Sequence, residues 1–204
     1  MRDQWYGDNR DLVKWGVLLR LAAIHRAKKI IQVAYSRPSR WDALDIDGES
    51  HPLPRLVLDH FRDIRSVANL TNDPEIQVVA SAFSDRGAYN KEVLQVVAES
   101  AGLPCIVFLD PDTGLAPRRP DLAHVLEEEL ADIWKSMRNG DVLVFYQHQT
   151  NRNGTPWVEP KRKQFERAIG LARGTAKIAQ ASAIARDVVF FYARKGSAKR
   201  GDAA

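Results

Sequence analysis

The stretch from Cys105 to Leu115 constrains the fold of this chain more than any other. It reads Cys-Ile-Val-Phe-Leu-Asp-Pro-Asp-Thr-Gly-Leu, so five apolar residues are followed at once by polar residues and turn formers. A short apolar run with β-branched and aromatic residues is typical of a strand buried on both faces. Pro111 cannot donate to a sheet ladder, and Gly114 favours a turn. The pattern therefore places Asp110 and Asp112 where a buried strand ends, which is where ligands bind in open α/β sheets.

Helical and extended segments alternate along the rest of the chain. Apolar periodicity predicts helices over residues 8–26, 53–67, 90–101, 122–137 and 160–172, with residues 36–52 as a loop. Strands are predicted at residues 29–35, 75–83, 105–109, 141–146, 176–181 and 187–193. The last two strands are too close in sequence for a helix between them, so we expect them to pair antiparallel. The prediction is an α/β fold: a doubly wound, mostly parallel sheet of the methyltransferase type with a C-terminal antiparallel strand pair.

Composition limits the class of protein. The 204 residues fit one domain, predicted over 1–195, followed by a basic tail at 196–204 that we expect to be disordered. No apolar run approaches the roughly 20 residues that a membrane span requires, and a cytoplasmic protein is expected. Cys105 is the only cysteine, which excludes an intramolecular disulfide and a cysteine-based zinc site. The net charge of +4 is compatible with nucleic acid or another anionic partner, or with solvated surface charge alone.

A second polar motif, Gln147-His148-Gln149, follows the strand predicted at 141–146. Consecutive parallel strands on one side of a switch point are usually neighbours. We therefore expect Gln147 and His148 to lie beside Asp110 and Asp112 at one edge of the sheet. A histidine near two carboxylates can serve as a general acid or base, or as a metal ligand. The alternative is a histidine that is hydrogen-bonded to the loop and holds its shape.

The N-terminal segment from Gly7 to Trp15 reads Gly-Asp-Asn-Arg-Asp-Leu-Val-Lys-Trp. It resembles the motif Gly-Asn-x-x-Asp-Val-Leu-Lys-His of bacterial adenine-N6 methyltransferases that act on large-subunit ribosomal RNA. Their catalytic tetrapeptide, Asp-Pro-Pro-Tyr, also closes a buried strand, and Asp110-Pro111 matches its first half. The chain is similar as well to a widespread group of bacterial proteins that share a Tyr-Gly-Asp start, Leu-Asp-Pro-Asp-[Asn/Thr]-Gly and Tyr-Gln-His. The resemblance implies binding of S-adenosylmethionine (SAM) by the residues Lys14, Tyr35, Asp110 and Pro111.

The chain departs from that family at two places. Asp112 and Thr113 stand where the family has Pro-Tyr, so the aromatic residue that would stack on adenine is missing. The turn after the first strand contains no glycine before Gly48, although methyltransferases carry a glycine-rich turn there for the cofactor.

Three functions remain open from the sequence. The first is a SAM-dependent methyltransferase, with nucleic acid as a candidate substrate, in which Asp110 accepts a hydrogen bond from the target amino group. The candidate catalytic residues are Asp110, Asp112 and His148, and the candidate substrate-binding residues are Gln147, Arg37 and Arg40. The second is a hydrolase of phosphodiesters in which those three catalytic residues bind Mg²⁺, with Asp8 or Asp11 as a further ligand. The third is a catalytically silent binding module on the same scaffold.

These interpretations lead to geometric expectations. The strands at 105–109 and 141–146 should be adjacent and parallel. Trp15, Leu19 and Phe61 should be buried, whereas Arg37 and Arg40 should be exposed on the Ser/Pro loop. Lys14 is the candidate to neutralise Asp110 if the first helix reaches this edge of the sheet.

Overall fold

The structure is a computed structural model that describes residues 7–37, 43–57, 63–100, 102–149, 151 and 154–196. The predictions for Phe61, for Arg40 and for the tail beyond residue 196 lie outside the described residues.

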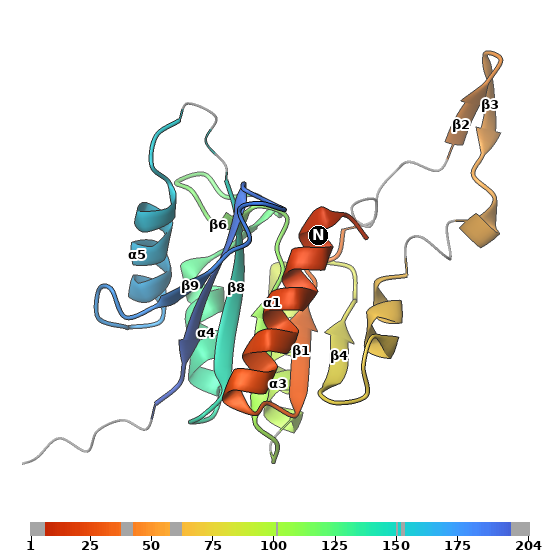
Figure 1. The fold of residues 1–204 in the computed structure, drawn as a ribbon. Helices are drawn as coiled ribbons and strands as arrows, with labels where there is room; N and C mark the ends of the chain where they lie inside the picture. Colours follow the sequence, from red (N-terminus) through yellow and green to blue (C-terminus); the bar gives the residue numbers. More distant parts are fainter. Residues whose placement is uncertain are drawn as a thin grey trace, which may run out of the picture.

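The core of the molecule is a six-stranded sheet with the strand order β4-β1-β5-β8-β10-β9 (Figure 1). The strands are β4 (Glu75–Val79), β1 (Lys29–Val33), β5 (Cys105–Leu109), β8 (Val142–His148), β10 (Val188–Arg194) and β9 (Lys177–Ala179). The first four in this order are parallel, and β10 runs antiparallel to both of its neighbours. The predicted doubly wound sheet with a C-terminal antiparallel pair is therefore confirmed, and so is the adjacency of β5 and β8.

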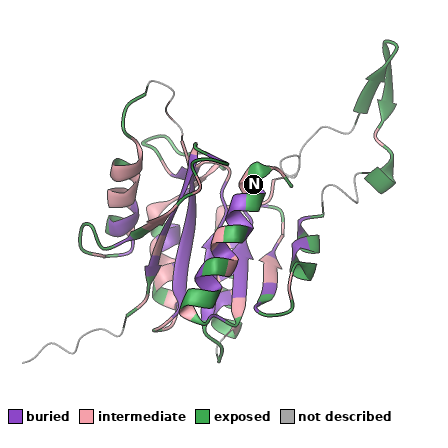
Figure 2. Ribbon diagram, viewed as in Figure 1, coloured by how far each residue is buried: buried purple, intermediate pink, exposed green. Residues whose placement is uncertain are grey.

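Helices cover the two faces of the sheet unequally. The helix α1 (Asn9–His25) and the short 3-10 helix η2 (Ile64–Asn69) pack on one face. The helices α3 (Arg86–Glu99), α4 (Glu127–Ser136) and α5 (Val158–Ala168) pack on the other. Figure 2 shows the buried strands between these layers. No helix in the described part of the chain is long and apolar enough to cross a membrane.

The helix α1 runs back along the sheet, so its N-terminus lies at the carboxyl edge of the parallel strands (Figure 1). Asp8 caps it by accepting hydrogen bonds from the backbone N–H groups of Arg10 and Asp11. Trp15 is buried, as predicted, but Leu19 is only half-buried and Leu12 is 64% exposed. The buried side of α1 is shifted from the predicted apolar side because two charged residues, Asp11 and Lys14, are also turned towards the sheet.

Several predicted elements differ from the structure. The loop predicted at 36–52 contains a hairpin of β2 (Ala43–Ile46) and β3 (Glu49–Pro52), whose residues are all exposed. Asp47 and Gly48 have φ angles of 56° and 84°, which is the Asp-Gly turn that favours such a hairpin. The helix predicted over 53–67 is wrong in its described C-terminal part, because residues 64–69 form a 3-10 helix. Leu56, an apolar residue of that pattern, is 83% exposed.

Several helix and strand boundaries also differ from the predicted ones. The cap of α3 is Asp85, so this helix begins at Arg86 and not at residue 90 as predicted. The helix predicted from residue 122 begins only at Glu127, because His124–Val125 (β7) pairs instead with Gly114–Leu115 (β6). The strands β1 and β4 end at Val33 and Val79, earlier than predicted.

The strand β8 continues beyond the predicted end at residue 146. Its ladder with β10 runs on, with Gln147 opposite Val189 and His148 opposite Val188. Gln147 and His148 are therefore the last residues of a strand and not part of the following loop.

Candidate functional site

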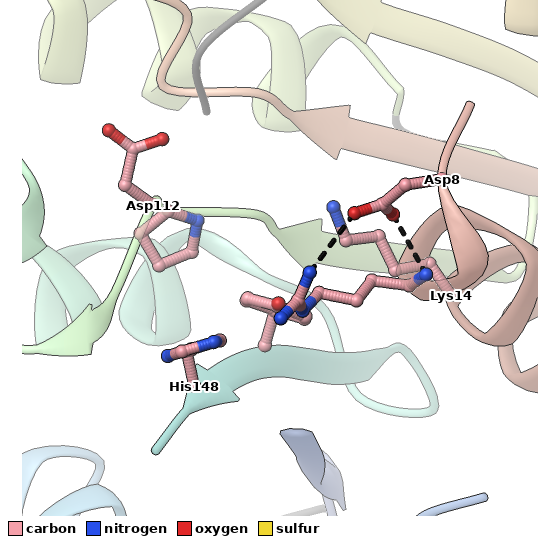
Figure 3. A pocket seen from close by; sticks show the side chains of 7 residues that line it. Asp8, Lys14, Asp112 and His148 are labelled. Atoms are coloured by element: carbon pink, nitrogen blue, oxygen red, sulfur yellow. Dashed lines mark hydrogen bonds and ion pairs between the residues drawn. The ribbon is translucent and has the colours of Figure 1, made fainter. Parts of the chain in front are cut away.

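A small cavity of about 180 Å³ lies at the carboxyl edge of β5 and β8, beside the N-terminus of α1. Figure 3 shows Asp8 and Lys14 on the α1 side, with Asp112 after β5 and His148 at the end of β8. The cavity is lined by Asp8, Arg10, Lys14, Pro111, Asp112, Tyr146 and His148. The expectation that the two strand-end motifs meet at one edge is therefore confirmed.

Beneath the cavity, Lys14 is held between two buried carboxylates. Its Nζ lies 2.9 Å from Asp11 Oδ1 and 2.9 Å from Asp110 Oδ1. Gln32, one residue before the end of β1, donates from Nε2 to Asp110 Oδ2 over 3.0 Å. Lys14 Nζ also lies 4.7 Å from the centre of the Tyr146 ring, within the range of a cation–π contact. Lys14 is therefore the cation that neutralises Asp110.

Burial and the neighbouring charges shift the pKa of Lys14 in opposite directions. Burial alone would lower the pKa of Lys14, but the charges of Asp110 and Asp11 outweigh it and hold that pKa above its ordinary value. Burial raises the pKa of Asp11, although Lys14 partly offsets this. Asp110 is completely buried and does not line the cavity. Its position fits the attachment of α1 to β5 and does not provide the direct ligand contact that the sequence predicted.

A second polar chain leads from α1 to the end of β8. Arg10 contacts Asp8 at 3.2 Å and Asp187 Oδ2 at 2.5 Å, and the same Asp187 oxygen lies 3.0 Å from His148 Nε2. Burial alone would raise the pKa of Asp187, but its hydrogen bond and charge contact with Arg10, together with His148, keep that pKa below its ordinary value. An ionised Asp187 can only accept a hydrogen bond, so a neutral His148 must carry its proton on Nε2. The lone pair of Nδ1 is then left to accept a proton.

At the rim of the cavity, Asp112 forms an ion pair with Arg37 from the turn after β1. The Arg37 side chain is only 22% exposed, so the prediction that it would be exposed is wrong. The turn folds towards the site because the Asp112 carboxylate attracts the guanidinium group.

Gln147 is completely buried and holds the loop after β5 against β8. Its Oε1 accepts from Leu115 N at 2.9 Å, and its Nε2 donates to the Thr113 carbonyl at 3.0 Å. Gly114 has a φ of 122°, and a Cβ at this position would lie 2.3 Å from Gln147 Oε1. Only glycine fits there. Gln147 therefore holds the loop in place and does not line the cavity, although the sequence predicted that it binds the substrate.

The turn after β1 does not fit SAM. In dinucleotide-binding sheets this turn is glycine-rich so that the ligand can approach the backbone. Here Tyr35 has a φ of 47° and its ring packs on Phe83 and Tyr89, with ring centres 5.1 Å and 5.3 Å away. The Tyr35 backbone N–H is taken by the Tyr89 hydroxyl at 2.9 Å. Because Tyr35 is 3% exposed, the cofactor contact predicted for it is not accessible.

The three residues predicted to bind Mg²⁺ do not form a metal site. No three His, Cys, Asp or Glu residues come together in metal-binding geometry within the described ranges. Each candidate ligand has a different partner: Asp110 pairs with Lys14, Asp112 with Arg37, and His148 with Asp187.

Carboxylates outnumber permanent cations around the small cavity and directly beneath it. There are five carboxylates and three such cations, namely Asp8, Asp11, Asp110, Asp112 and Asp187 against Arg10, Lys14 and Arg37. This excess favours a ligand group that is cationic or that donates hydrogen bonds.

A larger cavity of about 670 Å³ adjoins the small one and shares Arg10 and His148 with it. Its other lining residues are Asn9, Gln149, Asn151, Ile184, Ala185, Arg186 and Asp187. Sequence reasoning missed Arg10, Tyr146 and Asp187. The signal for Asp187 was its place just before an antiparallel strand, because such a strand begins where its parallel neighbour ends.

The strand order, with one antiparallel strand inserted near one end, defines the class of protein: a doubly wound α/β protein of the methyltransferase type. No protein-family model matches the sequence, and no curated protein matches it at a significant level.

Solved structures that resemble this chain include two crystal structures. One is a candidate methyltransferase of Thermobifida fusca, with 12% identity, a TM-score of 0.44 and coverage of 93% of this chain and 80% of that one. The other is a DUF574 family protein of Streptomyces avermitilis, with 10% identity, a TM-score of 0.41 and coverage of 92% and 82%.

Proposed function

We propose that this chain is an enzyme that acts on a small polar substrate by general acid–base catalysis, with His148 as the proton-transferring residue. The observation that carries the proposal is the His148–Asp187 pair at the junction of two cavities at the carboxyl edge of the sheet. A histidine oriented by a carboxylate is the usual arrangement for moving a proton to or from a substrate. Clefts at this edge are the usual ligand sites of such sheets.

The neighbouring residues have distinct roles in this proposal. Asp187 is a positioning residue that fixes the ring of His148, and Arg10 keeps Asp187 ionised through their 2.5 Å contact. The lining residues that the structure describes include no serine, threonine or cysteine. Proton transfer therefore fits the site better than covalent catalysis through a serine, threonine or cysteine nucleophile.

The second candidate is methyl transfer from SAM, with nucleic acid as an acceptor, and the strand order is the observation that favours it. His148 would then take the proton of the acceptor. The aromatic packing of Tyr35 against Phe83 and Tyr89 argues against the usual position of the cofactor.

The first test compares the wild type with His148→Gln in a small-molecule cell extract followed by mass spectrometry. We expect compounds that are consumed or formed by the wild type and not by His148→Gln. The matched control is His51→Gln on the exposed hairpin, which should behave like the wild type. Equal conversion by His148→Gln and wild type, with both variants folded by circular dichroism, would refute the acid–base role.

The second test is isothermal titration with SAM. If the enzyme works by acid–base catalysis without this cofactor, the dissociation constant for SAM should not lie below about 1 mM, which is the upper end of ordinary Michaelis constants. A micromolar dissociation constant would replace the first candidate with methyl transfer.

A further inference from the structure

The larger cavity differs in charge from the small one. Two guanidinium groups, those of Arg10 and Arg186, line it together with a single carboxylate, Asp187. The small cavity is lined by two carboxylates, Asp8 and Asp112, and two permanent cations, Arg10 and Lys14, and two further carboxylates lie beneath it. The two cavities meet at His148.

Three hydrogen-bond donors of the larger cavity are not used within the described residues. Arg186 is exposed and forms no hydrogen bond or ion pair with them, and the same holds for the side chain of Asn9. The Nε of Arg10 is buried and donates to no acceptor in the described part of the chain. A buried donor without an acceptor is unusual in proteins and calls for an acceptor from outside the chain.

The other polar side chains that line this cavity already have partners. Gln149 donates to the carbonyl of Asn151 over 2.9 Å, and the Asn151 amide donates to Thr155 Oγ1 over 2.7 Å. The two cations among the unused groups, Arg186 and Arg10 through its Nε, can only donate hydrogen bonds. An oxyanion matches such a set, because guanidinium groups bind carboxylate and phosphate through paired N–H donors.

We propose that the larger cavity holds an oxyanion group of the substrate, a carboxylate or a phosphate, through Arg186 and Arg10 Nε. This inference rests on the proposed function, because it identifies the substrate class of the same site. The substrate then carries an anionic group in the larger cavity and a cationic or proton-donating group towards Asp112 and Asp8 in the small one. The atom that exchanges a proton with His148 lies between these two groups.

The test is a nuclear magnetic resonance titration of the wild type with inorganic phosphate and, separately, with acetate at low ionic strength. We expect saturable shifts at the backbone amides of Asn9, Gln149 and Arg186. The anion that binds more tightly shows whether the cavity prefers a phosphate or a carboxylate. Sodium chloride at the same ionic strength should not produce these shifts.

The decisive variant is Arg186→Gln, which should weaken this binding about tenfold or more, as expected for the loss of a charged hydrogen bond. The matched control is Arg20→Gln, an exposed arginine on the outer side of α1, which should bind like the wild type. Shifts confined to other residues, or equal affinity in Arg186→Gln and wild type, would overturn the proposal.

His148→Gln separates the two proposals. If the anion still binds this variant but extract conversion equals that of the wild type, the anion site stands and the acid–base role fails. If conversion is lost in His148→Gln but Arg186→Gln binds anions normally, only the anion site fails.

Discussion

Lys14 is the residue on which the carboxyl edge depends most directly. It is 5% exposed, and its ammonium group is shared by Asp11 and Asp110, which are 6% and 0% exposed. Burying such charges has a large desolvation cost that only their mutual attraction offsets. Lys14, Asp11 and Asp110 therefore depend on one another. Removing one of the three side chains leaves the desolvation cost of the others without a compensating attraction.

Replacing Lys14 with Met should lower the free energy of unfolding by about 3–5 kcal/mol, because two buried carboxylates lose their cation. Urea denaturation at neutral pH measures this. The matched control is Lys28→Met, which breaks an exposed pair with Asp73 and should change the stability by less than about 1 kcal/mol. Equal effects of the two substitutions would show that the Lys14 cluster is not a stabilising unit.

Asp187 leads to a prediction about pH. Its pKa in the folded state lies below its ordinary value of 3.8, so its stabilising contribution is present above that pH and is lost as the pH falls through the lower pKa. The stability difference between wild type and Asp187→Asn should therefore be smaller at pH 3 than at pH 7. Urea unfolding of both proteins at pH 3 and pH 7 measures it. A difference that is as large at pH 3 as at pH 7 would contradict the ion-pair network.

At the scale of elements, the loop after β5 and the end of β8 form one unit through Gln147. Gly114 allows this because the Gln147 side chain occupies the space that a Cβ would need. The loop carries Asp112, and β8 carries His148, so the clamp sets the distance between the two sides of the cavity.

Gly114→Ala should therefore destabilise the protein by about 2 kcal/mol or more, since it adds both a steric clash and backbone strain. Gly87→Ala, in the first turn of α3, is the control, because a Cβ there makes only an ordinary contact of 3.5 Å. We expect the control to be neutral or slightly stabilising. Thermal unfolding compares the two, and a neutral Gly114→Ala would show that the clamp adapts at low cost.

At the scale of the whole molecule, the sheet and its helices should behave as one cooperative unit, as the predicted single domain over 1–195 requires. The strands β1, β5 and β8 are almost wholly buried, whereas every residue of the β2–β3 hairpin is exposed (Figure 2). An isolated two-stranded hairpin is at best marginally stable in water.

Native-state hydrogen exchange should therefore show the three central strands exchanging together, only through global unfolding, and the hairpin exchanging many times faster. Mass spectrometry of peptic fragments resolves both regions. Protection of residues 43–52 equal to that of β5 would show that the hairpin is held by a contact beyond its own ladder.

The sequence by itself determined the sheet and the meeting of two strand-end motifs, because short apolar runs and their order along the chain depend on local chemistry and simple connection rules. It also pointed to Lys14 as the partner of Asp110. Only the tertiary structure decided which side of α1 is buried, because Asp11 and Lys14 are acceptable inside only where Asp110 meets them. It likewise decided that His148 pairs with Asp187 and that Tyr35 fills the turn after β1, since these contacts join residues far apart in the sequence whose types alone do not select a partner.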